Sequence, residues 1–408
     1  RYTNQLSTPT TNLQPAIRYP QTHIIIIILT FIVAPAMLTT MMNNSKSALH
    51  VFLLTTLFLL STPCHGFKSS PILKPSSSAN YFDSGCMANP VILPPAPGSD
   101  EWQCYYYGNA GSWDGGHPCF LPTGSSGLAV SDDGLSGWTK IAGGNDDGSM
   151  LAPSSTKWDS VQTGVGDVVR ISSNELHMYY FGGSDEAISM GPGSIVGFRM
   201  RIGRAKSMDN GRSWVKNDSY CLDYDGEEGL FASWPRIIVN SDKDWTMFYH
   251  AFDGKKWRVF GATSTDQGDT WTRTGLVLEG STSETDFDFA GIGTRAVTPW
   301  RDGLLMIYEG VDDSSAHRLG AAYCTTMKTG KQQWTKLNNG EPILEPGKGP
   351  LGEWTKQVIG TPYVVNMPDG SLRIYHCAKD GPDGKMAIGV VESKSGDISP
   401  DSWTAVEL

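Results

Sequence analysis

The stretch Trp245-Thr-Met-Phe-Tyr-His-Ala251 decides the fold, because the chain carries five versions of it. Each version is an aromatic strand that follows a short apolar strand and precedes a strand of small residues. Aligned on their shared tyrosines, the copies lie roughly 60 to 75 residues apart. The shared tyrosines are Tyr106, Tyr180, Tyr249, Tyr308 and Tyr375. A strand-rich unit repeated at this period predicts an all-β, five-bladed β-propeller over residues 86–408.

The composition agrees with many short strands and turns. Of the 408 residues, 46 are Gly and 24 are Pro, and both residue types punctuate chains at turns. The formal net charge of −10 argues against a nucleic-acid partner, since phosphate binding needs a basic face. The sequence contains no zinc-ligand spacing. We therefore expect no cofactor and no nucleic acid, with a structural Ca²⁺ ion as an open alternative.

The first 85 residues lie outside the repeat. Residues 1–40 fit an upstream or non-native extension, because a better-formed targeting signal follows them. Residues 41–66 have a charged start, an apolar run over 48–60 and a cleavage site after Gly66, which predicts a signal peptide. Residues 67–85 are rich in Ser and Lys and resemble either a transit peptide or a disordered linker. We expect entry into the secretory pathway, a secreted or plastid destination, and no stable membrane insertion after processing.

Two further segments share the pattern S-x-D-x-G-x-[ST]-W, known as the Asp box. They are Ser207-Met-Asp-Asn-Gly-Arg-Ser-Trp214 and Ser264-Thr-Asp-Gln-Gly-Asp-Thr-Trp271. The aspartate can accept backbone N–H groups within the turn, the glycine can adopt positive φ, and the tryptophan can cover the hairpin. We interpret these aspartates as structural.

The long acidic loops and the starts of the inner strands indicate where a site lies. Inner strands are expected to start near residues 89, 167, 234, 294 and 361. Asp167, Arg236 and Arg295 are therefore expected in one small volume near the propeller axis. One residue beyond the shared tyrosines come His250, Glu309 and His376, which either meet near the axis or form buried polar pairs between blades.

Five blades, Asp-box turns and inner strands that open Asn-Pro, Asp-Val, Trp-Pro and Thr-Pro resemble the furanosidase-type glycoside hydrolase superfamily. That group includes the arabinanases of family 43, the invertases and the levansucrases of family 32 type. The resemblance implies a carbohydrate substrate and three acids at inner-strand starts. These are a base or nucleophile on blade one, an orienting Asp on blade two and a general-acid Glu on blade three.

Carried over by position, the resemblance matches only one of the three acids. The orienting aspartate falls on Asp167, the blade-one aspartate on Asn89, and the blade-three glutamate near Ser233 and Trp234. Asn cannot act as a base. Either the catalytic set has moved, or the protein binds sugar without cleaving it. Sialidases also carry Asp boxes, and form a second alternative, although they have six blades.

We therefore predict a glycoside hydrolase that acts on a furanoside or related sugar by carboxylate acid/base catalysis. The catalytic candidates are Asp167, Glu309 and Glu228. Neighbouring arginines are expected to hold Asp167 ionised, which leaves the proton-donor role to Glu309 in preference to Glu228. The substrate-binding candidates are Asn89, Trp234, Arg236, His250, Asp288, Arg295 and His376.

Overall fold

The computed structural model describes residues 69–110, 124–190, 193–325, 333–379 and 384–408. The chain divides into two compact units, residues 1–65 and 66–408, and every described residue belongs to the second. The described segments consist of β-strands and four short 3₁₀ helices, without an α-helix, so the predicted all-β class is confirmed. None of their helices is long and apolar enough to cross a membrane. The predicted extension (1–40) and signal peptide (41–66) lie outside the described residues.

The strands form five successive antiparallel groups of four. The first two groups are β1 (Cys86–Leu93), β2 (Trp102–Asn109), β3 (Ser125–Ser131) and β4 (Thr139–Ile141), then β5 (Gln162–Arg170), β6 (Leu176–Gly183), β9 (Met200–Ser207) and β10 (Val215–Leu222). A small hairpin, β7 (Ile188–Met190) and β8 (Gly193–Ile195), lies between β6 and β9.

The remaining three groups repeat the same order. They are β11 (Ser233–Ser241), β12 (Asp244–Phe252), β13 (Trp257–Ser264) and β14 (Thr272–Glu279); β15 (Gly291–Trp300), β16 (Gly303–Val311), β17 (His317–Cys324) and β18 (Thr335–Lys336); and β19 (Val358–Asn366), β20 (Leu372–Lys379), β21 (Ala387–Ser393) and β22 (Thr404–Ala405). A single parallel bridge between Trp257 and Gly291 joins the third and fourth groups into one sheet. The 3₁₀ helices are η1 (Asn338–Gly340), η2 (Gly349–Leu351), η3 (Glu353–Thr355) and η4 (Pro400–Ser402).

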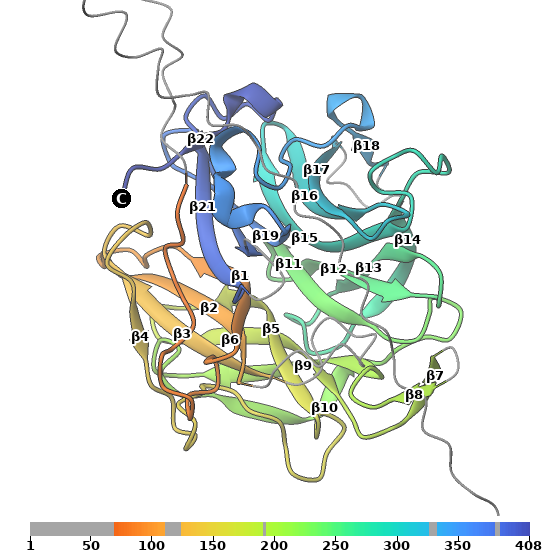
Figure 1. Ribbon diagram of the computed structural model, residues 1–408. Coiled ribbons are helices and arrows are strands. Elements are labelled where there is room, and N and C mark those ends of the chain that lie inside the picture. Colours follow the sequence, from red (N-terminus) through yellow and green to blue (C-terminus); the bar gives the residue numbers. More distant parts are fainter. Residues whose placement is uncertain (1–68, 111–123, 191–192, 326–332, 380–383) are drawn as a thin grey trace, which may run out of the picture. The chain divides into compact units, whose positions relative to one another are not determined.

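The first strand of each group lies innermost, and we call β1, β5, β11, β15 and β19 the inner strands. Each inner strand contacts the next along the chain, and β19 also contacts β1. These strands lie in the middle of the unit, with β4, β10, β14, β18 and β22 around its outside (Figure 1). Burial follows the same order. Every residue of β1 and β16 is buried, whereas β10 and β14 each have a single buried residue.

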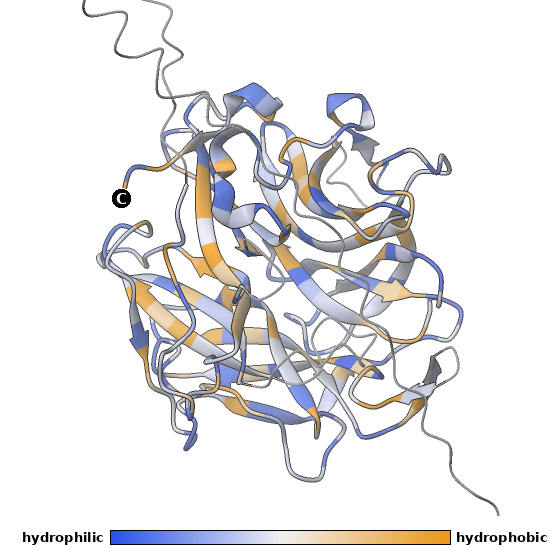
Figure 2. Cartoon of the chain, in the orientation of Figure 1, coloured by the Kyte–Doolittle hydropathy of each residue, from blue (hydrophilic) through white to orange (hydrophobic). Residues whose placement is uncertain are grey.

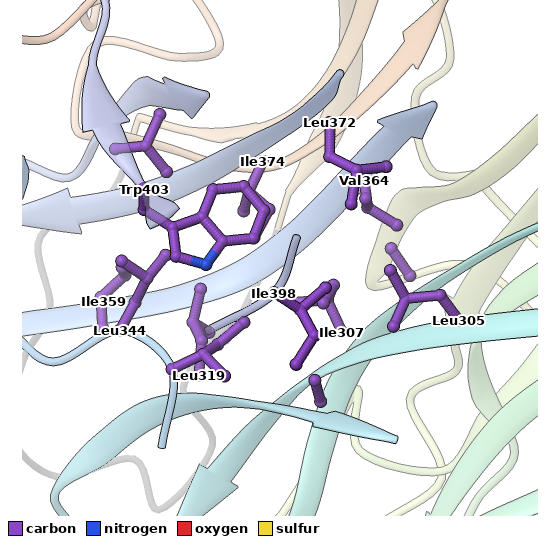
Figure 3. Close-up of a cluster of buried hydrophobic side chains, with 14 of the residues drawn as sticks. Leu305, Ile307, Leu319, Leu344, Ile359, Val364, Leu372, Ile374, Ile398 and Trp403 are labelled. Atoms are coloured by element: carbon purple, nitrogen blue, oxygen red, sulfur yellow. The ribbon is translucent and has the colours of Figure 1, made fainter. Parts of the chain in front are cut away.

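Apolar clusters fill the space between successive groups. One cluster joins the fourth group to the fifth, with Leu305 and Ile307 facing Val364, Leu372 and Ile374 (Figure 3). Another joins the first group to the fifth, through side chains such as Ile92, Tyr375 and Ile388. Hydropathy agrees, since apolar residues concentrate on the strands and polar ones in the loops (Figure 2). Because burial of apolar area drives this packing, the groups are held together mainly by these clusters.

The segment before β1 does not behave as predicted. Residues 67–85 were expected to be either a transit peptide or a disordered linker, but the described part, 69–85, is integrated into the fold. Leu73 forms a β-bridge with Ile388, and Phe82 is 4 % exposed within the cluster of the first and fifth groups. The linker prediction is wrong for this segment, because its apolar residues fill a gap between two sheets.

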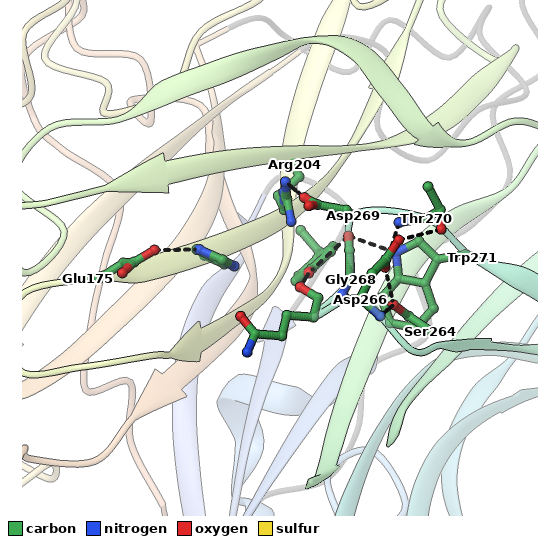
Figure 4. Close-up of polar contacts among 11 residues, drawn as sticks. Glu175, Arg204, Ser264, Asp266, Gly268, Asp269, Thr270 and Trp271 are labelled. Carbon is green, nitrogen blue, oxygen red and sulfur yellow. Dashed lines mark hydrogen bonds and ion pairs between the residues drawn. The ribbon is translucent and has the colours of Figure 1, made fainter. Parts of the chain in front are cut away.

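The two Asp-box segments form the turns between third and fourth strands. In the turn shown in Figure 4, Asp266 Oδ1 accepts a hydrogen bond from the backbone N–H of Thr270 at 3.0 Å. Trp271 Nε1 donates to the carbonyl of Gly268 at 3.2 Å. Gly268 has φ +78°, and a Cβ there would clash with the Tyr179 hydroxyl of the neighbouring group. The aspartates of these turns are therefore structural.

Candidate functional site

Every inner strand has a shift in its pairing register with the second strand of its group, at an equivalent position. The register between an inner strand and its neighbour shifts between Ala88 and Val91, Val165 and Asp167, Ser233 and Arg236, Ile292 and Arg295, and Gly360 and Tyr363. In three of them a residue that precedes proline has positive φ: Asn89 (52°), Trp234 (48°) and Thr361 (44°). Positive φ is rare for non-glycine residues, and for a β-branched threonine it is an outlier. Such bulges re-aim side chains and gather at functional sites.

Asp167 follows the bulge of β5 and is 6 % exposed. Its Oδ1 accepts hydrogen bonds from Val168 N at 2.9 Å and the Tyr363 hydroxyl at 3.2 Å, and its Oδ2 accepts one from Ile237 N at 2.7 Å. Burial raises the pKa of Asp167, although Arg236 and these hydrogen bonds act in the opposite direction. The stabilising effect of an arginine that the sequence predicts is present, but desolvation has the larger effect on the pKa of Asp167.

Arg236 and Arg295 lie close to Asp167, as predicted. Arg236 Nε donates to the Arg295 carbonyl at 2.8 Å, and Nη2 donates to Asn89 Oδ1 at 3.2 Å. The Arg236 guanidinium also lies over the Tyr363 ring, 5.0 Å from its centroid. Arg295 Nη2 donates to the Phe248 carbonyl at 3.2 Å. The inner strands thus bring Asn89, Asp167, Arg236, Arg295 and Tyr363 together, and with Thr361 and Glu309 we call them the inner cluster.

Glu309, at 5 % exposure, joins the cluster from β16. Its Oε2 accepts hydrogen bonds from the Thr294 hydroxyl and from Thr361 N, the latter at 3.2 Å. Its Oε1 lies 2.5 Å from His317 Nδ1. Burial alone would raise the pKa of Glu309, but the contacts with His317, Thr294 and Thr361 lower it overall. Glu309 is therefore ionised near neutral pH, which does not favour the proton-donor role predicted for it from the sequence.

The backbone beside Glu309 is shaped to admit this carboxylate. A Cβ atom on Gly360 would overlap Oε1 of Glu309, and one on Gly293 would lie 3.6 Å from Oε2. Glycine at position 360 therefore removes a side chain that would displace the carboxylate. The pKa of His317 is raised by Glu309, whose effect exceeds the opposing effect of burial. His317 and Glu309 form a buried ion pair with a short path to solvent, because the His317 side chain is 22 % exposed.

His250 and Trp234 lie beside the cluster and have unsatisfied ring nitrogens. His250 Nδ1 lies 2.8 Å from the Gly293 carbonyl, and since a carbonyl only accepts, Nδ1 carries the proton. Burial and the nearby Arg295 hold the pKa of His250 well below its usual value, so Nε2 is an acceptor. Neither His250 Nε2 nor Trp234 Nε1 has a partner among the described residues. The two rings lie 5.0 Å apart.

Two predicted site residues, Glu228 and Asp288, belong to a repeated structural arrangement instead. Four carboxylates lie just before an inner strand. Each accepts a hydrogen bond from a tyrosine on the second strand of its group and forms an ion pair with a lysine or arginine on the outermost strand. These tyrosine triads are Asp83–Tyr106–Lys140, Asp159–Tyr180–Lys216, Glu228–Tyr249–Arg273 and Asp288–Tyr308–Lys336. Burial raises the pKa of all four tyrosines, so they remain protonated donors.

The triads give Glu228, a predicted catalytic residue, and Asp288, a predicted substrate-binding residue, hydrogen-bond partners within their own strand groups. Both oxygens of Glu228 accept from the Tyr249 hydroxyl, at 2.9 and 2.8 Å, and Oε2 accepts from Arg273 at 3.2 Å. Asp288 is 1 % exposed and accepts from Lys336 at 2.6 Å. These carboxylates tie strands of one group together. The sequence suggested otherwise because their loops are acidic, and acidity alone does not separate bound from available carboxylates.

His376 also differs from its predicted place, because the alignment on Tyr375 is off by one residue. Tyr375 pairs with Tyr363, just as Tyr179 pairs with Asp167, so His376 occupies the position of the triad tyrosines. Its ring stacks on Trp354 at 5.5 Å, and both ring nitrogens lack a partner in the described structure. Burial lowers the pKa of His376 to about 4. Since successive side chains of a strand face opposite sides, the residue that faces the inner cluster is Cys377.

Three residues of the site were missed from the sequence: Tyr363, Thr361 and His317. Tyr363 and Thr361 lie on β19, which was recognised only by its Thr-Pro opening. His317 begins β17, two residues from Leu319, the partner of Glu309 in the hairpin register. Residues two apart on a strand share a face, so His317 lies on the same face as Leu319, beside Glu309. The length of this hairpin could therefore have predicted the contact between Glu309 and His317. The described residues contain no group of three or more His, Cys, Asp or Glu that would hold a metal ion.

Comparison with known proteins bears on the fold. No protein-family model matches the sequence, and no curated protein sequence matches it either. Among solved structures, the chain is similar to a glycoside hydrolase with 17 % identity and a TM-score of 0.59, and the match covers 82 % of this chain and 93 % of that protein. The chain has the fold of the propeller glycoside hydrolases.

Two further structures carry the same fold. A thermostable family-43 glycoside hydrolase matches with 15 % identity and a TM-score of 0.53, covering 77 % of this chain and 92 % of that one. The Bombyx mori GH32 β-fructofuranosidase BmSUC1 matches with 13 % identity and a TM-score of 0.54, over 79 % of this chain and 62 % of that one. The resemblance seen in the strand openings and turns is thus confirmed at the level of fold.

Proposed function

We propose that the protein cleaves glycosidic bonds at the inner cluster of a closed, five-bladed propeller. The observation that carries the proposal is that two buried carboxyl groups, Asp167 and Glu309, both accept hydrogen bonds from β19, through Tyr363 and Thr361. Their pKa values shift in opposite directions, that of Asp167 upward and that of Glu309 downward. Glycoside hydrolysis needs one carboxyl group that donates a proton and one that is ionised. Closure of the ring is supported by the contacts between β19 and β1 and by the apolar cluster shared by the first and fifth groups.

The pKa shifts assign the roles in reverse of the sequence-based expectation. Glu309 is the ionised base or nucleophile, and its negative charge is stabilised by His317, Thr294 and Thr361. We assign the proton-donor role to Asp167, since burial shifts its pKa upward whereas the pKa of Glu309 is lowered. Its Oδ2 accepts a single hydrogen bond, from Ile237, so one lone pair on this oxygen is available to carry the proton.

The remaining groups of the inner cluster and its surroundings bind the sugar. Hydroxyl groups of a carbohydrate both donate and accept hydrogen bonds. They would meet the acceptor His250 Nε2 and the donors Trp234 Nε1 and Arg236 Nη1, none of which is satisfied by another described residue. Buried unsatisfied polar groups are rare and call for an explanation such as a ligand or ordered water. The furanoside preference implied by the resemblance forms part of this proposal.

A second candidate, carbohydrate binding without cleavage, is favoured by one observation. Asn89 occupies the position where the resemblance implies a blade-one acid, and its amide is held by Val165 and Arg236. An amide cannot act as a base at any pH. The sialidase alternative has less support, because the described residues form five groups of four strands and no sixth.

Turnover of a defined glycoside panel tests the proposal. The full chain would be incubated with aryl α-L-arabinofuranoside, aryl β-D-xyloside, sucrose, levan and arabinan, and free sugar would be measured with time. The proposal predicts release from at least one furanoside, and proton NMR of the first product would then show whether configuration is retained. Binding of these sugars without turnover of any of them would replace hydrolysis by the binding function.

The targeting prediction becomes a separate proposal. We infer that residues 41–66 direct the chain into the secretory pathway and are removed after Gly66. Amino-terminal sequencing of protein recovered from the source cells tests this inference. A mature terminus at Phe67 would support it, and a terminus upstream of Ala48 would contradict it.

A further inference from the structure

Two arginines at the centre of the inner strands are buried without a carboxylate bound to either. Arg236 is 2 % exposed and Arg295 is 0 % exposed. Their hydrogen bonds go to backbone carbonyls and to the neutral amide of Asn89. Arg236 Nη1 and Arg295 Nε have no partner at all within the described part of the chain. Buried charges are normally paired, because removing them from water is costly.

Other arginines of the chain show the usual arrangement. Arg204, at 4 % exposure, forms an ion pair with Asp269 in the turn drawn in Figure 4. Arg199 and Arg201 each pair with Glu186. Among the buried arginines of the described residues, Arg236 and Arg295 are therefore the two that have no ion pair with a carboxylate.

The acids nearest to the two arginines do not bind their guanidinium groups directly. Asp167 acts on the pKa of both arginines through its charge, but it accepts its hydrogen bonds from Val168, Ile237 and Tyr363, and no ion pair within 4.0 Å joins it to either guanidinium among the described residues. Glu309 is neutralised by His317 at 2.5 Å. Burial and the charge of Arg236 hold the pKa of Arg295 well below its usual value. The centre of the site is thus short of negative charge.

We propose that the substrate carries an anionic group, a carboxylate or a sulfate ester on a sugar ring, which binds the unpartnered N–H groups of Arg236 and Arg295. The proposal rests on the sugar-binding site proposed above and names its substrate class. Guanidinium groups suit such anions, because charge-assisted hydrogen bonds to carboxylate or sulfate are stronger than neutral ones. His250 Nε2 would accept from a hydroxyl of the same ring.

Binding measured by isothermal titration calorimetry tests the proposal independently of catalysis. The full chain would be titrated with D-glucuronate, D-galacturonate, their methyl esters, the parent hexoses and a hexose 6-sulfate. The methyl ester keeps the shape of the uronate and removes its charge. We expect at least one anionic sugar to bind about tenfold or more tightly than its neutral counterpart, with an advantage that falls as salt rises. Equal affinity for charged and neutral sugars would overturn the proposal.

Variants show whether the two arginines cause the preference. Arg295→Met should abolish it, and Arg295→Lys should retain part of it, since lysine keeps the charge. Arg204→Met is the matched control, because it removes another buried arginine outside the inner cluster and should leave the preference unchanged. A preference that survives in folded Arg295→Met and Arg236→Met would contradict the proposal. If Arg295→Met does not fold, the comparison of uronate with methyl ester in the parent protein still decides.

The outcomes separate this proposal from the function on which it rests. Preferential binding of an anionic sugar, with no release of sugar from the aryl glycoside of that same sugar or from the neutral panel, would support the anion site and refute hydrolysis. Turnover of neutral glycosides, with no preference for anions, would refute the anion site and leave hydrolysis in place.

Discussion

The inner cluster and the tyrosine triads both bury carboxylates, but they treat them in opposite ways. Each triad carboxylate has a tyrosine hydroxyl and a cation within hydrogen-bond distance, as in Asp288 with Tyr308 and Lys336. In the inner cluster, Asp167 lies beside arginines that do not bind it, and several nitrogens lack partners among the described residues. Every triad carboxylate has a cation bound to it, whereas the two buried arginines of the inner cluster have no carboxylate bound to them. The unpartnered nitrogens of Arg236 and Arg295, and not burial or acidity, distinguish the two regions.

The largest effect is expected for Glu309→Gln. The substitution keeps the hydrogen bond from Thr361 and removes the charge that acts as base or nucleophile. We expect turnover to fall by about 10²- to 10⁴-fold, measured as kcat on the best substrate of the panel. Circular dichroism would check that the variant is folded. Unchanged turnover in folded Glu309→Gln would show that this carboxylate is not part of the chemistry.

The next prediction concerns the ion pair of Glu309 with His317, through the pH dependence of stability. The lowered pKa of Glu309 gives stability above its unfolded pKa near 4.5, which is lost as pH falls through the lower folded value. The raised pKa of His317 gives stability below its unfolded pKa near 6.5, which is lost as pH rises through the higher folded value. The pair therefore stabilises most between these two unfolded values.

His317→Gln is the variant that measures this contribution. We expect it to lose about 2 kcal/mol of unfolding free energy near pH 5.5, and less at alkaline pH, where the parent has also lost the charge of His317. Urea unfolding at several pH values provides the measurement. The control is His177→Gln, because His177 contacts Glu175 away from the inner cluster and its pKa is lowered by burial. A loss for His317→Gln that does not change with pH would contradict the ion pair.

The smallest effect is expected in a triad. Tyr308→Phe removes the hydroxyl that donates to Asp288, but Lys336 and the backbone N–H of Ser281 still bind this carboxylate. We expect a loss of about 1 kcal/mol of unfolding free energy and unchanged turnover. Tyr323→Phe, at the surface beside Asp302, is the control and should have no measurable effect. Lower turnover per folded molecule in Tyr308→Phe would contradict the purely structural role of the triads.

The sequence predicted the repeat well, because its periodicity records the strands directly. The all-β class, the positions of the inner strands and the Asp-box turns are all found in the structure. The proximity of Asp167, Arg236 and Arg295 was also predicted, since equivalent positions of successive repeats meet at the centre. The register of the fifth copy was wrong by one residue, because Tyr375 and His376 are both plausible aromatic positions in a strand.

The roles within the site could not be predicted in the same way. Whether a carboxylate is structural depends on partners from distant strands, such as Arg273 for Glu228 and Lys336 for Asp288. The direction of the pKa shift of Asp167 depends on burial, which outweighs the opposing effect of Arg236. The packing of residues 69–85 was missed because their Ser-rich composition hides the apolar side chains Leu73 and Phe82, which are buried.

The most direct test applies one substitution to both regions. Asp167→Asn and Asp288→Asn make the same isosteric change in two buried aspartates, one in the inner cluster and one in a triad. Turnover per folded molecule and the free energy of unfolding would be measured for both. We predict that Asp167→Asn lowers turnover at least about 100-fold, while Asp288→Asn keeps turnover and loses about 2 to 3 kcal/mol of stability, because Lys336 loses its ionised partner. Full turnover in Asp167→Asn, or an equal loss of turnover in both variants, would contradict the account.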